Sequence, residues 1–287
     1  MPDVWLPPYL RLDAALAQFI AVLETQGQQH IKPLHQHIAI RLVIEGGFDP
    51  EEIIPHPPLL VDARGGRNRL VFDQGAQQEN EQTVLGGLKT KAIDVVVAKP
   101  RIGPVVAISV KGTGGAFRNL TNRMEEAIGD STNLHIMYPG LVYAFLHVIK
   151  AHRAGAPGLA PNDIAVDGGG DVVQAIRRYH DVLLGLAGRR FVRDDFTRYE
   201  AVSLALVNSD PVAAGTTFET FPTADSPLNL RAFFDTIYRT YDLRFPYLAA
   251  SVASLKRLDW HESSPALTCL GSEPEMRLRL GYTPRLG

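Results

Sequence analysis

Apolar residues recur at helical spacing near the start of the chain. Those that share one helix face are Leu12, Leu16, Phe19, Ile20 and Leu23. Gly27 is a residue type typical of the end of such a helix. We predict a second helix from Pro33, a favoured first-turn residue, to the Gly46-Gly47 pair. Turn-forming and polar residues dominate positions 63–90, where we expect mainly loops.

The pattern changes after residue 90. Two runs rich in β-branched residues, 92–98 and 104–111, predict a buried β-hairpin. Next we predict a helix whose apolar face contains Phe117, Leu120, Met124 and Ile128. A strand (or a helix) over 141–149 and a helix capped by Asp171 follow. The last predicted elements are a strand over 199–207 and a helix that begins at Ser226-Pro227. This order predicts an α/β fold with a mixed sheet flanked by helices.

Composition narrows the class of protein. The 287 residues are 45% apolar, which excludes a disordered or collagen-like chain. The longest apolar run, 141–149, is far shorter than the roughly 20 residues of a membrane helix, so we expect no membrane span. No signal peptide is visible, and the single cysteine, Cys269, fits a reducing compartment. We therefore expect a cytoplasmic protein.

Positive charge is concentrated in one segment. The whole chain has 29 Lys and Arg against 31 Asp and Glu, a formal net charge of −2. Residues 86–123 nevertheless hold seven cations against Asp94 alone: Lys89, Lys91, Lys99, Arg101, Lys111, Arg118 and Arg123. A local basic stretch of this kind can meet a polyanion even when the total charge is near zero.

The predicted hairpin carries the candidate chemistry. Asp94 lies in an otherwise apolar run, where a lone carboxylate is costly unless a cation or strong donors accompany it. The next strand ends in Ser109-Val110-Lys111, and Ser109 and Lys111 point to the same sheet face. A carboxylate and a lysine at the ends of adjacent strands suit metal-assisted phosphodiester hydrolysis. The alternative is a structural Asp94–Lys111 ion pair.

The following helix offers a second carboxylate. Asn122 and Glu125 share one of its faces with Arg118, and Glu125 can look back at the strand ends. Glu126 takes that place if the helix register differs by one residue. Both acids also fit the ordinary role of solvated charges on a helix surface.

Residues 92–127 resemble the active-site core of the PD-(D/E)-x-K nuclease superfamily, and most of all type II restriction endonucleases. Asp94 and Lys111 match the Asp and Lys of that pattern. Ser109 departs from it, since the middle acidic residue is missing. A Ser-x-Lys variant of the family recruits a Glu from the next helix, and Glu125, with thirteen residues between it and Lys111, is similar to that variant. The resemblance covers about residues 90–130, with a compatible β-α-β order through 207.

The resemblance implies a restriction-endonuclease-like fold and a Mg²⁺-dependent endonuclease acting on double-stranded DNA. Asp94 and Glu125 would bind Mg²⁺ with the Val110 carbonyl, Lys111 would orient or activate the nucleophile, and Ser109 would be a secondary polar contact. We expect a single domain over residues 1–287, in which an N-terminal helical region (residues 1–60) precedes a catalytic core (residues 85–208) and a C-terminal helical region (residues 209–287). A homodimer and a companion DNA methyltransferase are further implied partners.

Several residues are candidates for DNA contact. Arg and Asn read guanine and adenine edges well, whereas lysines position a phosphate backbone. The candidates are Arg118, Asn119, Asn122 and Arg123 for bases or phosphates, and Lys89 and Lys91 for phosphates. Helix capping and plain surface charge are the alternative for these residues.

Glu45 is a candidate for an additional acidic residue of the active site, because several nucleases of this superfamily have an acidic residue on an early helix. The alternative is that Glu45 is a surface residue at the end of a helix. We expect the four early histidines to be surface and packing residues rather than a metal cluster: His30, His35, His37 and His56.

Two other function classes remain open. The stretch from Gly112 to Phe117 follows a strand and opens a helix, as a dinucleotide-binding turn does, although Phe117 stands where a small residue is needed. The other is a nuclease fold that binds DNA without cutting it, which the missing acid at Ser109 allows. No P-loop and no G-x-S-x-G elbow occurs in the sequence.

Overall fold

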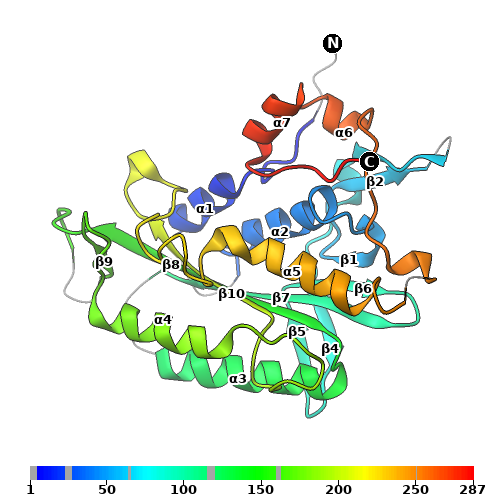
Figure 1. Ribbon diagram of the computed structural model, residues 1–287. Helices are drawn as coiled ribbons and strands as arrows, with labels where there is room; N and C mark the ends of the chain where they lie inside the picture. Colours follow the sequence, from blue (N-terminus) through cyan, green and yellow to red (C-terminus); the bar gives the residue numbers. More distant parts are fainter. Residues whose placement is uncertain (1–4, 23–27, 64–65, 115–119, 160–162, 250) are drawn as a thin grey trace.

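A central sheet with strands in both directions organises the molecule (Figure 1). The computed structural model describes residues 5–22, 28–63, 66–114, 120–159, 163–249 and 251–287. Its helices are α1 (Leu12–Ala21), α2 (Lys32–Ile44), α3 (Leu120–Met137), α4 (Gln174–Leu186), α5 (Leu230–Arg244), α6 (Pro265–Thr268) and α7 (Glu273–Leu280). Its strands are β1 (Ile53–Ile54), β2 (Leu59–Asp62), β3 (Arg69–Phe72), β4 (Gln82–Leu85), β5 (Thr90–Ile93), β6 (Val95–Lys99), β7 (Gly103–Thr113), β8 (Val142–Arg153), β9 (Ala165–Val166) and β10 (Ala201–Asn208).

The central sheet has the strand order β1-β6-β7-β8-β10, and β9 pairs with β8. β6 and β7 form an antiparallel hairpin, whose turn includes Arg101 and Gly103 with positive φ angles. β7, β8 and β10 run parallel to one another. Parallel neighbours need crossover connections, and α3 supplies the first of them while α4 lies in the second.

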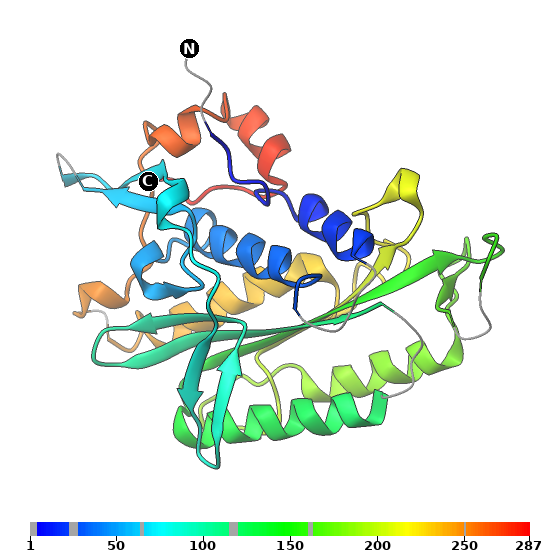
Figure 2. The ribbon, with the colours of Figure 1, turned by 180° about the vertical axis from the view of Figure 1, so that it is seen from behind.

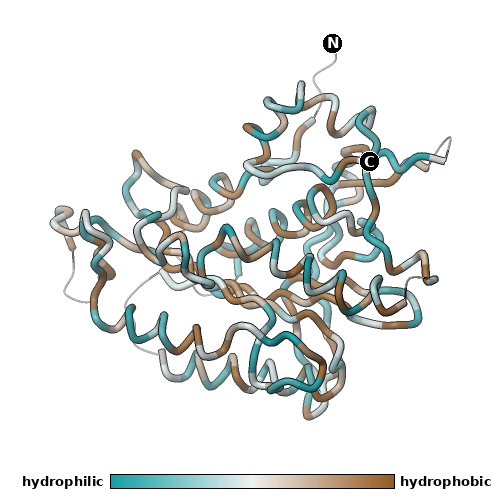
Figure 3. The backbone as a smooth tube through the Cα atoms, in the orientation of Figure 1, coloured by the Kyte–Doolittle hydropathy of each residue, from teal (hydrophilic) through white to brown (hydrophobic). Residues whose placement is uncertain are grey.

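Helices cover both faces of this sheet (Figure 2). α3 and α4 lie on one face, and α1, α2 and α5 lie on the other. Side chains of β7 alternate between the two: Ile108 and Val110 pack with the α2 and α5 residues, whereas Ala107 packs with the α4 residues. Hydrophobic positions accordingly follow the central strands (Figure 3). The sheet is buried on both sides, which explains why its strands read as almost continuous apolar runs.

Two smaller sheets extend the structure. β2 pairs with β3, which contacts α6, and β4 pairs with β5, which leads directly into β6. The turn between β4 and β5 is tied to α3, because the Asn133 side chain accepts hydrogen bonds from the Leu88 and Lys89 amides at 2.8 and 3.0 Å. The β4–β5 hairpin therefore links the sheet edge near Asp94 to the helix that follows β7.

A buried ionic group near the start of β10 joins four other segments, namely α3, β8, α5 and the loop after α4. The Glu200 side chain is fully buried and accepts hydrogen bonds from Arg189, from Arg244 and from the Tyr143 amide, each at 2.7 Å. It also lies 3.3 Å from His135. Burial opposes the charge on this carboxylate, but these donors outweigh burial and hold the pKa of Glu200 below its ordinary value.

The predicted α/β class with a mixed sheet flanked by helices is confirmed. Positions 63–90 are largely loops, as predicted, but they also contain the short strands β3 and β4, which were not predicted. The last helix before the C-terminal segments begins at Leu230 rather than at Ser226, because the Asn229 side chain accepts from the Arg231 amide and caps it. The first helix ends at Ala21, and Gly27 lies outside the described residues.

The part of the chain that the structure describes contains no helix with both the length and the apolar character to cross a membrane.

Candidate functional site

Asp94 occupies a single-residue break between β5 and β6. It is 9% exposed, and its Oδ2 accepts a hydrogen bond from the Val110 amide of β7 at 2.7 Å. Burial raises the pKa of Asp94, although the Val110 amide and the Lys111 ammonium act in the opposite direction. The predicted continuous strand over 92–98 is thus interrupted at Asp94, and the interruption turns one carboxylate oxygen toward β7.

Lys111 lies near the C-terminal end of β7, one residue after the partner of Asp94. Its ammonium nitrogen is 3.5 Å from Oε1 of Glu126 on α3, and the Lys111 side chain is 29% exposed. Lys111 also lowers the pKa of Asp94, so its charge acts on both carboxylates. The end of the hairpin and the helix after it therefore meet at this lysine.

Glu126, rather than Glu125, is the acid of α3 that faces the sheet end. Besides Lys111, its carboxylate lies 2.8 Å from Arg123 and 3.7 Å from Lys91. Burial alone would raise the pKa of Glu126, but Lys111, Arg123 and Lys91 together lower it. Glu125 is exposed.

The face that α3 buries differs from the predicted one. Ile128 was expected on the packed face, but it is 37% exposed. Among the side chains of the helix that the structure describes, the buried ones are Ala127, Asp130, Ser131, Asn133, Leu134 and His135. Four of these are polar, so an apolar stripe did not reveal the packed face. This rotation of the helix explains why Glu126 replaces Glu125 beside Lys111.

Ser109 does not reach the solvent side of the site. It is 3% exposed, and its hydroxyl shares a 2.8 Å hydrogen bond with the Tyr143 hydroxyl of β8. Behind Lys111, His147 of β8 is buried and bonds to Thr113 through Nε2 at 2.9 Å and to Tyr179 through Nδ1. Burial lowers the pKa of His147 to about 3, so this imidazole is neutral. These contacts stabilise the end of β7 on the sheet face that α4 covers.

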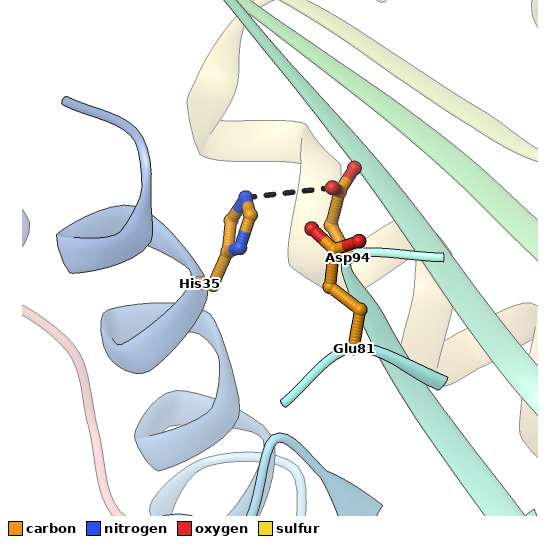
Figure 4. A group of neighbouring side chains, drawn as sticks. All are labelled: His35, Glu81 and Asp94. Carbon is orange, nitrogen blue, oxygen red and sulfur yellow. Dashed lines mark ion pairs between the residues drawn. The ribbon is translucent and has the colours of Figure 1, made fainter. Parts of the chain in front are cut away.

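A second group of side chains meets Asp94 from the α2 side (Figure 4). His35 of α2 and Glu81, just before β4, point toward the carboxylate of Asp94. One ligand atom from each of the three residues lies within 4.8 Å of the other two. Nε2 of His35 is 3.7 Å from Oδ1 of Asp94, the oxygen that Val110 does not bind. Asp94 therefore belongs to two polar groups, one that includes Lys111 and one that includes His35 and Glu81.

The other early histidines behave differently from His35. His30 is buried and packs against Phe19, with ring centroids 5.9 Å apart. His37 is fully buried and donates from Nδ1 to the Tyr9 carbonyl at 3.0 Å. His56 bonds through its Nδ1 to the Pro57 carbonyl at 2.7 Å. Sequence reasoning treated all four alike and missed His35 and Glu81, whose separation of 46 residues leaves no local pattern.

Glu45 is not brought to this site. It lies ten residues after His35, which on an α-helix is an axial distance of about 15 Å. Its carboxylate pairs with Arg41 at 2.6 Å and accepts a hydrogen bond from the Tyr238 hydroxyl at 3.1 Å. Glu45 thus belongs to the packing between α2 and α5.

The predicted DNA-contact residues are spread around α3 and the β4–β5 hairpin. Lys89, Asn122 and Arg123 are exposed. Lys91 is partly buried and lies 2.5 Å from Asp130, so much of its charge is locally neutralised. Arg118 and Asn119 lie outside the described residues.

Gly112 has a packing role that bears on the nucleotide-binding alternative. It lies within β7, so the strand continues into the predicted glycine turn. A Cβ at Gly112 would come within 2.8 Å of Phe19 and 2.9 Å of Ile31. The glycine therefore permits close contact of β7 with α1 and with the residue before α2, which explains it without a nucleotide. Residues 115–119 of the predicted turn lie outside the described residues.

Comparison with known protein families, with curated proteins and with solved structures found no match to this chain.

Proposed function

We propose that the protein is a Mg²⁺-dependent endonuclease that hydrolyses double-stranded DNA at a specific sequence, as a type II restriction enzyme does. One observation carries the proposal: Lys111, at one end of the hairpin, lies 3.5 Å from the carboxylate of Glu126 and its charge also acts on the buried carboxylate of Asp94. Such a set supplies oxygen ligands for a hard cation and a charge for the scissile phosphate.

The donor set at this sheet end fits Mg²⁺. Val110 donates its amide to Asp94, and the carbonyl of a strand residue faces the same strand edge as its amide. Two carboxylates and one backbone carbonyl from Asp94, Glu126 and Val110 are oxygen donors, which Mg²⁺ prefers. When bound, Mg²⁺ stabilises charge on the phosphate oxygens and lowers the pKa of its water.

The protein's own residues have distinct roles in this proposal. Lys111 projects from the strand end at 29% exposure, so it can bind a phosphate oxygen and orient the attacking water. Asp94 is held by the Val110 amide, which fixes the direction of its free oxygen. Glu126 takes the role first expected of Glu125, because only Glu126 faces Lys111.

Exposed polar residues of α3 and of the β4–β5 turn suit a nucleic-acid backbone. Lys89 and Arg123 provide positive charge, and Asn122 provides a hydrogen-bonding side chain. Two copies related by a two-fold axis would match the symmetry of a palindromic site, and a methyltransferase of the same specificity would protect the host DNA. Both partners are part of the proposal.

A second candidate is a DNA-binding protein on the same fold without catalysis. The observation that favours it is the burial of Ser109 against Tyr143, which leaves β7 without a carboxylate beside Lys111. In that case the basic residues would still bind DNA.

Digestion of phage DNA by the purified protein, with Mg²⁺ and with EDTA, tests the proposal. We expect discrete bands with Mg²⁺ that Asp94→Asn and Lys111→Ala abolish, while Lys256→Ala, an exposed lysine after the η5 turn Ala253–Leu255, leaves them unchanged. A smear would show that cleavage is non-specific and would overturn the sequence-specific part of the proposal. Intact DNA with a Mg²⁺-independent gel shift would favour the binding protein, and intact DNA without a shift would overturn both candidates.

A further inference from the structure

The α2 side of Asp94 contains a buried nitrogen without a hydrogen-bond partner. His35 is 4% exposed, and its Nε2 has no hydrogen-bond partner among the described residues. The 3.7 Å from this atom to Oδ1 of Asp94 exceeds the length of a hydrogen bond. Figure 4 shows the ring directed at that carboxylate. Buried polar atoms are normally satisfied, so an orphaned nitrogen aimed at a carboxylate calls for a ligand.

Glu81 adds a second orphaned atom to the same point. Its Oε1 is buried and likewise lacks a hydrogen-bond partner within the described ranges. A cavity of about 10 Å³ lies against His35, Glu81 and Asp94. That volume is close to what a single water-sized group occupies. The space is therefore about the size of one small ion.

We infer that His35, Glu81 and Asp94 form a binding site for one divalent transition-metal ion. One imidazole nitrogen and two carboxylates are a mixed donor set, and imidazole favours transition metals over Mg²⁺.

The spacing of the three ligand atoms suits such an ion after a small adjustment. Two atoms bound at about 2.1 Å to one ion lie at most about 4 Å apart. The His35–Asp94 distance of 3.7 Å is inside this limit. The widest separation in the group is 4.8 Å or less, and a small rotation of the longer Glu81 side chain closes the difference.

The neighbouring lysines do not fully neutralise the two carboxylates of the group. Lys32 also lines the cavity, but its ammonium lies 3.4 Å from Glu79. Lys111, whose charge also acts on Asp94, lies 3.5 Å from Glu126 and is shared with it. The two carboxylates of the site therefore keep part of their attraction for a divalent ion.

This inference deepens the proposed function and rests on it for the meaning of the shared residue Asp94. On the α3 side, Asp94 belongs with oxygen donors and Lys111; on the α2 side, it belongs with an imidazole nitrogen. The ion bound by His35 would fix the second oxygen of Asp94, as the Val110 amide fixes the first. Ion binding can be measured whether or not the protein cuts DNA.

Pulsed electron paramagnetic resonance of Mn²⁺ added to the full-length protein tests the site. A nitrogen bound directly to Mn²⁺ gives a ¹⁴N modulation that carboxylates and water do not give. We expect this modulation in the wild-type protein, its loss in His35→Gln, and at least a tenfold weaker Mn²⁺ affinity in Glu81→Gln. Glu81→Gln alters a partly exposed side chain, so it tests the site even if His35→Gln does not fold.

Two control variants separate this site from the others. His37→Asn removes a buried histidine from the same helix and should keep the ¹⁴N modulation, since His37 faces Tyr9 instead of Asp94. Glu126→Gln should keep it as well, because Glu126 lies on the α3 side. A wild-type protein without ¹⁴N modulation, or a folded His35→Gln protein that retains it, would overturn the inference. A protein that binds Mn²⁺ in this way but leaves DNA intact would refute only the nuclease proposal.

Discussion

The ammonium nitrogen of Lys111 lies 3.5 Å from Oε1 of Glu126, and this contact selects one of two adjacent acids on α3. Glu125 directly precedes Glu126 in the sequence, but its side chain is exposed. Because consecutive residues of a helix differ in direction by about 100°, only one of the pair can reach the end of β7. The two glutamates therefore form a natural matched pair for mutagenesis.

Glu126→Gln should reduce DNA cleavage by about 100-fold or more, at the lower end of what a positioned catalytic group contributes. The amide keeps the size of the side chain but loses the charge that faces Lys111. Glu125→Gln should cleave like the wild type, since its side chain is exposed. Initial cleavage rates of a plasmid under single-turnover conditions compare the two. Equal rates, or a greater loss in Glu125→Gln, would refute the assignment of Glu126.

Asp94→Asn should abolish cleavage with little loss of stability. The asparagine carbonyl can still accept the Val110 amide, so the contact between the β5–β6 break and β7 survives. Burial already disfavours the charged form of Asp94, as the raised pKa shows. We expect the rate to fall by about 10²–10⁴-fold, with a thermal midpoint no lower than that of the wild type. Substantial cleavage by a folded Asp94→Asn protein would contradict its proposed role.

The parts of the fold that follow from local patterns were predictable. The positions of β7, β8 and β10 can be predicted from their apolar runs, because both faces of the sheet are buried. β3 and β4 were missed because each has four residues amid turn-forming and polar neighbours. Such strands are stabilised by pairing with another strand, which a single short segment does not reveal.

The candidate site was predictable only where its residues share a hairpin. Asp94 and Lys111 stand out as charged residues bordering apolar strands. The choice of Glu126 depends on how α3 is rotated, and buried polar residues such as Asp130 and Ser131 hide its packed face from a hydrophobicity pattern. His35 and Glu81 meet Asp94 only through tertiary folding.

Lys89 should contribute to DNA affinity through charge rather than through base recognition. It is exposed at the β4–β5 turn, and no ion pair to it is formed in the described parts of the structure. Lys89→Ala should reduce the slope of log Kd against log salt concentration by about one, the change expected for one phosphate contact. Lys256→Ala is the matched control. Fluorescence anisotropy at several salt concentrations measures both, and an unchanged slope in Lys89→Ala would exclude this contact.

Glu200→Gln should destabilise the fold by about 3–5 kcal/mol, because it leaves two buried arginines without their shared carboxylate. Arg189 and Arg244 each lie 2.7 Å from Glu200, at a position where its side chain is fully buried. Urea denaturation gives the free energy of unfolding. The exposed pair of Glu273 and Arg277 on α7 is the control, and Glu273→Gln should change stability by less than about 1 kcal/mol. Similar effects of the two substitutions would show that the buried group is not structurally important.

Stability should fall as the pH drops below about 6.5, the ordinary pKa of histidine, and His37 should account for part of the loss. Burial lowers the pKa of His37 to about 3 in the folded protein. Between these two values the unfolded chain binds one more proton at this residue, so full stability is present above pH 6.5 and declines as the pH falls. For one such histidine the loss between pH 7 and pH 5 is about 2 kcal/mol.

His37→Asn removes this titration while its amide can still donate to the Tyr9 carbonyl, which the wild-type Nδ1 contacts at 3.0 Å. Between pH 7 and pH 5, the free energy of unfolding of His37→Asn should therefore fall by about 2 kcal/mol less than that of the wild type. Urea denaturation at a series of pH values gives this difference directly, because any constant cost of the substitution cancels. Parallel curves for the two proteins would mean that His37 takes up its proton equally well in the folded and unfolded states.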